Sequence, residues 1–411
     1  MIRWIIFIAI FGLIDFYAFQ AVKTIFRSKG VNIIYIIISV AVLGNFIYQI
    51  VSTGRTVGIH IKMNLAIGLF LTLYIPKIAI MLIMFGEDIF RVPQAIFRYF
   101  TEGGNPESSG YLPSRRKFVS QIAMGIAAIP FASFLYGMVI GKYNFKVLKY
   151  TLHFEDLPDA FDGYKITQIS DIHSGSFDNK EKIEYAVDLV NDQKSDVILF
   201  TGDMVNNKAT EMLPWKETFS KLNAKDGMYS IFGNHDYGDY VGWDTDDEKR
   251  ENLKHLEAIE KEIGFDLLKN ESRFIEKNGQ RIAIVGVENW GKGFKQKGDL
   301  AKASSSIDAN DFKILLSHDP SHWQHQVIDD DYHYHLTLSG HTHGMQFGIE
   351  IPGWIKWSPV KWRYKYWAGV YKEKGQYINV NRGFGFLAFP GRVGIWPEIT
   401  VIELKKGSDS A

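Results

Sequence analysis

Four long apolar runs lie within the first 141 residues, and they constrain the fold of this chain more than any other feature. Each is about 20 or more residues of mainly Ile, Leu, Val, Phe, Ala and Gly, long enough for a helix to cross a hydrocarbon core of ~30 Å. The first run is too long for a removable signal peptide and lacks a small-residue cleavage pattern. We therefore predict four α-helical membrane spans, at residues 2–22, 31–51, 64–85 and 118–141.

The rest of the chain alternates apolar and polar residues as a soluble protein does. We expect a transmembrane region over residues 1–141, with a linker at 86–117, and a globular domain over 142–411. Part of the linker, from Thr101 to Ser114, is rich in Gly, Ser, Pro and Asn, which is typical of a flexible segment.

Lysine and arginine residues beside the spans set the expected orientation, because cytoplasmic loops carry an excess of them. Eight lie in the first and third loops: Lys23, Arg27, Lys29, Arg91, Arg98, Arg115, Arg116 and Lys117. Six lie on the other side: Arg3, Arg55, Lys62, Lys142, Lys146 and Lys149. This bias predicts that the globular domain of a multi-pass cell-membrane protein lies on the extracytoplasmic face.

The pair Arg115-Arg116, directly before the fourth apolar run, has two interpretations. It resembles a twin-arginine export motif, which would deliver a folded domain across the membrane. It also fits ordinary positive flanking charges of a membrane span. Both interpretations leave the globular domain outside.

Two ionisable residues lie deep inside the apolar runs, Asp15 in the first and Lys77 in the third. Each lies about 20 Å from the start of its run, at 1.5 Å per residue, and both spans run in the same direction. Charges at such depth are costly and usually face a partner, so we predict an ion pair between them. In the alternative, Lys77 extends towards the interface and Asp15 stays protonated.

Composition excludes several kinds of site. The chain has no cysteine, which rules out disulfides, iron–sulfur clusters and thiolate zinc sites. Any metal must therefore be held by nitrogen and oxygen ligands. Lys+Arg and Asp+Glu are balanced at 46 each, so no global positive charge recruits nucleic acid, and nucleic acid is not an expected partner. The sequence does not indicate an oligomeric state.

In the globular part, short β-branched runs end on polar motifs. They cover Lys165–Ser170, Val197–Thr201 and Met228–Phe232, with helical patterns at Lys180–Gln193 and Asp247–Ile263. Later runs supply a second set of strands: Arg281–Val287, Phe312–Ser317, Leu336–Ser339, Tyr377–Val380 and Ile399–Leu404, with Asn278-Gly279 as a hairpin turn. This order predicts an α/β fold of two packed sheets with helices outside, and ligands at the carboxyl ends of the strands.

Five motifs follow one another in this part and supply carboxylates, imidazoles and one amide, which is what a pair of divalent cations needs. They are Asp171-Ile-His173, Gly202-Asp203, Gly233-Asn234-His235-Asp236, the lone His318, and Gly340-His341-Thr342-His343. Ligands of this type suit Mn, Fe, Zn or Co and do not choose among them.

On these motifs, residues 165–404 resemble the calcineurin-like metallophosphoesterases, and in particular their membrane-anchored bacterial branch. The resemblance implies a four-layer αββα sandwich. It also implies two divalent cations, one bound by Asp171, His173, Asp203 and His343, and the other by Asn234, His318 and His341, with Asp203 bridging the two.

The chemistry expected at such a centre needs no protein nucleophile. A water between two cations loses a proton readily and attacks in line as a bridging hydroxide, while the cations neutralise the phosphoryl oxygens. His235 follows a predicted ligand, so we expect it to protonate the leaving oxygen or to stabilise the transition state, with Asp236 orienting its imidazole.

Residues Gly348–Tyr371 interleave four tryptophans with basic residues. Such a mixture suits the headgroup region of a bilayer or a pocket for a lipid phosphate. It also suits an ordinary loop that packs on a sheet edge.

The leading interpretation is a membrane-anchored two-metal phosphoesterase that hydrolyses a phosphate ester or pyrophosphate bond in a small molecule or a lipid. One alternative is a pyrophosphohydrolase of nucleotide-linked lipids. Another is a regulatory metal-binding domain on a transport or sensing membrane module. Spans with few polar residues favour anchoring over transport.

Overall fold

The computed structural model describes residues 2–53, 60–101, 113–351 and 353–408. The chain forms two compact units. The first comprises Met1–Ser52 and Leu65–Tyr136, and the second comprises Thr53–Asn64 and Gly137–Ala411.

Four helices carry the apolar runs: α1 (Ile2–Ile25), α2 (Lys29–Ser52), α3 (Ile61–Thr101) and α4 (Pro113–Val139). By length and composition each can cross a membrane. The predicted linker at 86–117 is wrong over most of its length, because α3 continues to Thr101 and α4 begins at Pro113. Residues 102–112 lie outside the described residues. Helix α3 continues beyond its apolar run because polar residues after the run form ion pairs with α4.

These ion pairs join α3 to α4. Arg116 on α4 lies 3.1 Å from Asp88 and 3.7 Å from Glu87 on α3. Arg115 lies 3.8 Å from Glu87. The arginine pair thus has a packing role between two helices, which is compatible with either interpretation of it. Its role in export stays a prediction.

The ion pair predicted inside the spans is present. Lys77 Nζ lies 2.5 Å from Asp15 Oδ1 and donates a hydrogen bond of 2.7 Å to Ser39 Oγ. Tyr74 and Tyr35 donate hydrogen bonds to the Asp15 carboxylate at 2.7 and 3.2 Å. Three helices therefore supply a closed set of partners, which is how buried charges are tolerated in a bundle.

The second unit contains two six-stranded sheets. The first has the order β1 (Lys146–Phe154), β14 (Glu398–Lys406), β2 (Lys165–Ile169), β3 (Val197–Phe200), β4 (Met228–Ser230) and β5 (Phe265–Leu267). The second has the order β12 (Gly369–Glu373), β13 (Gln376–Val380), β9 (Leu336–Ser339), β8 (Phe312–Leu316), β7 (Gln280–Gly286) and β6 (Glu271–Lys277). Within each sheet, the strands that lead into the predicted motifs are parallel.

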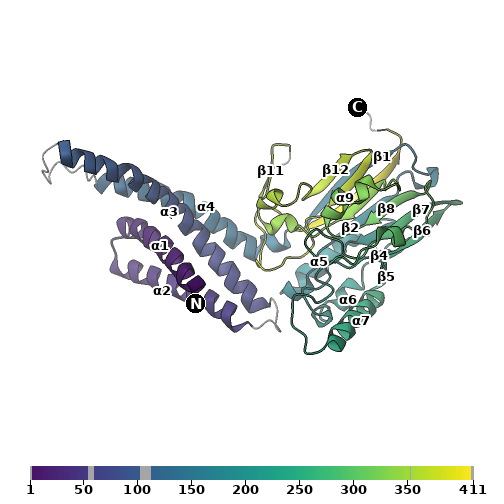
Figure 1. Ribbon diagram of the computed structural model, residues 1–411, viewed down its shortest axis with the longest axis horizontal. Helices are drawn as coiled ribbons and strands as arrows, with labels where there is room; N and C mark the ends of the chain where they lie inside the picture. The colour runs from purple at the N-terminus through teal and green to yellow at the C-terminus, as the bar shows by residue number, and fades with distance from the viewer. Residues whose placement is uncertain (1, 54–59, 102–112, 352, 409–411) are drawn as a thin grey trace. The chain divides into compact units, whose positions relative to one another are not determined.

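Alternate residues of each strand enter different cores, which makes the unit four layers thick. Val197 and Leu199 of β3 pack between the two sheets, whereas Ile198 and Phe200 pack against helices. The helices over the first sheet are α5 (Lys180–Asn191), α6 (Lys216–Phe219) and α7 (Asp246–Ile263). Those over the second are α8 (Leu300–Ala303) and α9 (Pro320–His325) (Figure 1). The predicted fold is confirmed.

Local signals explain the long helices. Asn179 and Thr245 accept hydrogen bonds from backbone N–H groups in the first turns of α5 and α7. Gly264 ends α7 in a left-handed conformation, with φ 112°. The Asn278-Gly279 turn joins β6 to β7 as predicted, with both residues at positive φ.

Candidate metal centre

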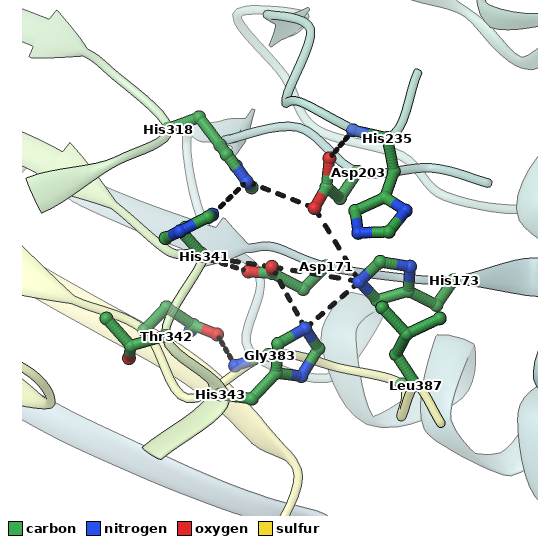
Figure 2. A network of polar contacts seen from close by, with 12 residues as sticks. Asp171, His173, Asp203, His235, His318, His341, Thr342, His343, Gly383 and Leu387 are labelled. Carbon is green, nitrogen blue, oxygen red and sulfur yellow. Dashed lines mark hydrogen bonds and ion pairs between the residues drawn. The ribbon is translucent and has the colours of Figure 1, made fainter. Parts of the chain in front are cut away.

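The predicted motifs converge at one edge of the two sheets. Asp171, Asp203 and Asn234 follow β2, β3 and β4 of the first sheet. His318 and His341 follow β8 and β9 of the second. Because the strands within each set are parallel, their carboxyl ends meet there, and residues far apart in sequence come within contact distance (Figure 2).

The first group comprises Asp171, His173 and His343, all buried. His343 Nε2 lies 3.2 Å from Asp171 Oδ1 and 3.0 Å from His173 Nε2. Ligand atoms of all three residues lie within 4.8 Å of one another, so one cation can contact them together.

The second group comprises Asp203, His318 and His341. His318 Nε2 lies 3.1 Å from Asp203 Oδ2 and 3.3 Å from His341 Nδ1. Asn234 adds an amide oxygen, which lies 2.8 Å from His341 Nδ1. The structure therefore brings together every residue that the sequence suggested for this group.

Asp203 lies between the two groups. Its Oδ2 faces His318 at 3.1 Å and His173 at 3.6 Å, while its Oδ1 accepts a hydrogen bond of 2.8 Å from the His235 N–H. Figure 2 shows this carboxylate between the imidazoles of both groups. This carboxylate faces one imidazole of each group, which is the position a bridging ligand needs.

The donor set fits divalent cations. His173 and His343 place two Nε2 atoms 3.0 Å apart, and at most one of these atoms can carry a hydrogen towards the other. His318 donates from Nδ1 to the Thr201 carbonyl at 2.7 Å, which leaves its Nε2 lone pair for the centre. Within the described part of the chain, no lysine or arginine lies within 4.0 Å of the buried Asp171 or Asp203 carboxylates. Buried charges of this kind need a compensating cation.

Electrostatic coupling at the centre is strong. Burial would raise the pKa of Asp203, but His318 and His235 hold it well below its ordinary value. Burial would likewise lower the pKa of His318, but the Asp203 carboxylate raises it to about 10. Burial lowers the pKa of His173 and outweighs the opposite effect of Asp203. Strong mutual shifts in one cleft are typical of functional sites.

The backbone that carries these groups is unusual. Five of the predicted ligands have positive φ: Asp171 (53°), His173 (47°), Asp203 (61°), His341 (70°) and His343 (50°). Such left-handed residues cost ~1–3 kcal/mol each and persist only where the surroundings hold them. Here the Gly385 N–H donates to the Asp171 carbonyl at 2.8 Å, which helps to hold the first of them.

Two motif glycines are required by close approach. A Cβ on Gly202, which has φ 93°, would overlap the backbone of Gly233. A Cβ on Gly340 would overlap Ser170 and the carboxylate of Asp171. The glycines therefore let the motif loops pack directly against one another.

His235 and Asp236 are both present at the centre, but their expected relation is wrong. His235 donates from Nδ1 to the Asn206 carbonyl at 2.7 Å, so Asn206 orients the imidazole. Asp236 is fully buried and accepts hydrogen bonds of 2.8 Å from the N–H groups of Asp203, Met204 and Gly233. Asp236 follows His235 in the sequence, but its side chain points to the Asp203 loop and not to the His235 ring.

Sequence reasoning also missed residues behind the ligands. His341 Nε2 lies 2.9 Å from Tyr364 Oη, and that hydroxyl donates to Asp319 Oδ2 at 3.3 Å. A ligand whose second nitrogen is held in this way has a fixed ring orientation. Asp319 follows His318 directly, which was a usable signal, but nothing in the sequence placed Tyr364 near His341.

Arg392 is another missed residue. It is fully buried, and its Nη2 lies 3.2 Å from His343 Nδ1 and donates to the Gly385 carbonyl at 2.6 Å. Burial lowers the pKa of its guanidinium to about 9. It fixes the loop that backs the first group.

Comparison with known proteins agrees with this geometry. Residues 2–142 match the family described as "Probable Calcineurin-like phosphoesterase, transmembrane domain", and residues 164–345 match "Calcineurin-like phosphoesterase". The uncharacterized metallophosphoesterase YkuE of Bacillus subtilis is 30% identical over 71% of this chain and 98% of its own length. The phosphodiesterase YaeI of Escherichia coli is 27% identical over 71% of this chain and 99% of its own. A Danio rerio transmembrane protein with metallophosphoesterase domain is 27% identical over 66% of this chain and 60% of its own.

Proposed function

This chain belongs to the calcineurin-like phosphoesterases and is a metal-dependent phosphoester hydrolase, and we propose that it uses two cations that share Asp203. The observation that carries the proposal is the position of the Asp203 carboxylate, which faces His318 at 3.1 Å and His173 at 3.6 Å. A single shared carboxylate would reduce the repulsion between two cations bound side by side.

In this proposal Asp171, His173 and His343 would hold one cation, and His318, His341 and Asn234 would hold the other. When bound, such cations neutralise phosphoryl oxygens and lower the pKa of the attacking water. The protein would set the spacing of the cations in two ways. The motif loops pack closely where Gly202 meets Gly233. The rings of His318 and His341 are held by hydrogen bonds from the nitrogen that faces away from the centre. Nitrogen and oxygen ligands of this kind suit Mn, Fe, Zn or Co.

His235 is proposed to exchange a proton with the leaving oxygen. Its Nδ1 is occupied by the Asn206 carbonyl, so Nε2 is the nitrogen available to a substrate. The ring also stacks on Tyr240, with centroids 4.4 Å apart, and it borders a cavity whose lining includes Asn207 and Leu387. A substrate phosphate in that cavity would lie beside this imidazole, whose ring centroid is 4.9 Å from that of His173 in the first metal group.

The assay that tests the proposal uses full-length protein, loaded with Mn²⁺, on aryl phosphates, phosphodiesters and lipid pyrophosphates. Turnover should require the metal, stop with a chelator and return when Mn²⁺ is restored. Asp171→Asn, which keeps the side-chain shape but removes a ligand charge, is the matched control. Stoichiometric metal binding without turnover of any substrate would instead favour a regulatory metal-binding domain.

The proposed membrane orientation places the catalytic unit on the extracytoplasmic face, supported by the excess of basic residues in the first and third loops. The chain has no native cysteine, so Ser408→Cys provides a unique reporter. It should react with an impermeant thiol reagent in intact cells. Reaction only after lysis would reverse the orientation.

A further inference from the structure

A hairpin beyond the last metal motif carries apolar side chains that the described residues leave uncovered. It consists of β10 (Ile349–Ile351) and β11 (Ile355–Trp357) and is followed by a short 3₁₀ turn, Pro359–Trp362. Figure 1 shows β11 in a hairpin that projects from the two large sheets. Trp354 at its turn is 77% exposed, and Trp362 is 76% exposed.

Strand register divides the hairpin into two faces. Ile349 lies opposite Trp357, and Ile351 opposite Ile355, so these four side chains share one face. Ile349 is 50% exposed and Ile351 is 42% exposed. Ile355 and Trp357 are half-buried, so the face is apolar along its length and open to solvent on the β10 side.

The opposite face holds the hairpin to the protein. Glu350 forms two contacts with Arg382, at 2.5 and 3.0 Å, and Lys356 donates a hydrogen bond to the Ala368 carbonyl. The polar face thus makes the internal contacts while the apolar face points outwards. This is the reverse of what burial in a soluble protein would produce.

The exposed apolar face continues into Trp362, whose ring centroid lies 6.1 Å from that of Trp357. Lys361 and Arg363 flank Trp362, are exposed, and make no ion pair with any described residue. We call the set Ile349, Ile351, Trp354, Trp357, Lys361, Trp362 and Arg363 the aromatic rim.

We propose that the aromatic rim inserts into the headgroup region of an anionic bilayer, the one in which the four spans anchor the chain. Tryptophan is enriched at membrane interfaces, and basic side chains beside it complement anionic headgroups. A contiguous exposed apolar patch is uncommon on a soluble surface and marks an interaction site. Because the spans tether the chain to the membrane, the aromatic rim meets lipid at a high effective concentration. A rim with only weak affinity for lipid therefore stays bound.

The rim also adjoins the metal centre in sequence, and the Arg363 guanidinium lies 5.4 Å from the centroid of the Tyr364 ring. Trp362 comes two residues before Tyr364, whose hydroxyl lies 2.9 Å from His341. Rim insertion would therefore bring the centre close to the lipid surface, where a membrane-borne phosphate is available.

The absence of cysteine makes a direct test possible. Trp354→Cys and Trp362→Cys, each made alone in the full-length protein, are labelled with an environment-sensitive fluorophore and reconstituted into vesicles containing phosphatidylglycerol. Tyr185→Cys, at an exposed position on α5, is the matched control. Turnover of a water-soluble aryl phosphate verifies that each labelled protein is folded.

The proposal predicts that brominated lipids quench the labels at 354 and 362 several-fold more than the label at 185. Adding Lys361→Glu to Trp354→Cys should reduce that quenching in anionic vesicles. Labels at 354 and 362 that remain as water-exposed as the control would overturn the proposal. Labels shielded from water yet not quenched by lipid would also overturn it and would identify a protein as the occupant. Equal quenching with and without Lys361→Glu would overturn the preference for anionic lipid.

Discussion

The Asp236 carboxylate accepts a hydrogen bond of 2.8 Å from the backbone N–H of Asp203, the residue whose side chain faces both candidate metal groups. It also binds the N–H groups of Met204 and Gly233. Burial, and then the neighbouring Asp203 charge, raise the pKa of Asp236 to about 7. The third motif thus positions the second motif, and does so through the backbone.

This relation predicts the effect of Asp236→Asn. The new amide NH₂ would face backbone N–H groups, leaving buried donors unpaired at a cost of ~1–3 kcal/mol. We expect a lower unfolding temperature and weaker metal binding, measured by thermal unfolding and metal titration. An unchanged unfolding temperature and metal content with only kcat reduced would contradict it, and would return Asp236 to a role on His235.

His235→Ala should keep both metals and lose most of kcat. His235 touches the proposed substrate space through Nε2, and proton transfer by such a group typically contributes ~10²–10⁴-fold. The loss should be larger for an alkyl phosphate than for an aryl phosphate, because the aryl leaving group needs less protonation. An equal kcat for variant and parent on the alkyl substrate would remove His235 from the mechanism.

The ion pair inside the spans predicts strong coupling between Asp15 and Lys77. Asp15→Asn and Lys77→Met should each destabilise the helical unit, because each leaves a buried partner uncompensated. The double variant should recover much of the loss, giving a coupling well above ~0.5 kcal/mol in thermal unfolding. Asp15→Asn combined with Lys142→Met, whose partner is Asp178, is the control and should be additive. Additivity in the Asp15–Lys77 cycle would show that the two do not interact.

His335 predicts a pH dependence of stability. Burial lowers its pKa from 6.5 to about 4, against the opposing effect of Asp156. Between those values the unfolded chain binds a proton that the folded protein does not, so stability falls as pH drops from about 6.5 towards 4. His335→Gln should reduce the difference in unfolding temperature between pH 7 and pH 5, while the exposed His255→Gln should not. Identical pH profiles for all three proteins would contradict this assignment.

The grouping of the candidate ligands could be anticipated from the sequence because these residues follow strands. A run such as Val197–Thr201 is apolar and β-branched up to the motif, so both the strand and its end are visible. Parallel order then brings Asp203 and Asn234 to one edge of the first sheet, and His318 and His341 to one edge of the second. By contrast, the edge strand β1 and the small strands β10 and β11 lacked a distinct pattern and were not predicted as strands.

What could not be predicted depends on three-dimensional contacts. The length of α3 is supported by ion pairs from Glu87 and Asp88 to α4, which no local pattern indicates. The left-handed backbone of His343 is held by surrounding loops and has no signature in its own sequence. The direction of the Asp236 side chain follows from the fold of the Asp203 loop.

The most direct test of the account is the metal content and turnover of Asp203→Ala, measured beside the parent protein after loading with Mn²⁺. The parent should bind two equivalents and turn over substrate. Asp203→Ala should bind at most one equivalent and show no turnover, because the carboxylate shared by both groups is gone. Two full equivalents in an active Asp203→Ala protein would contradict the shared centre.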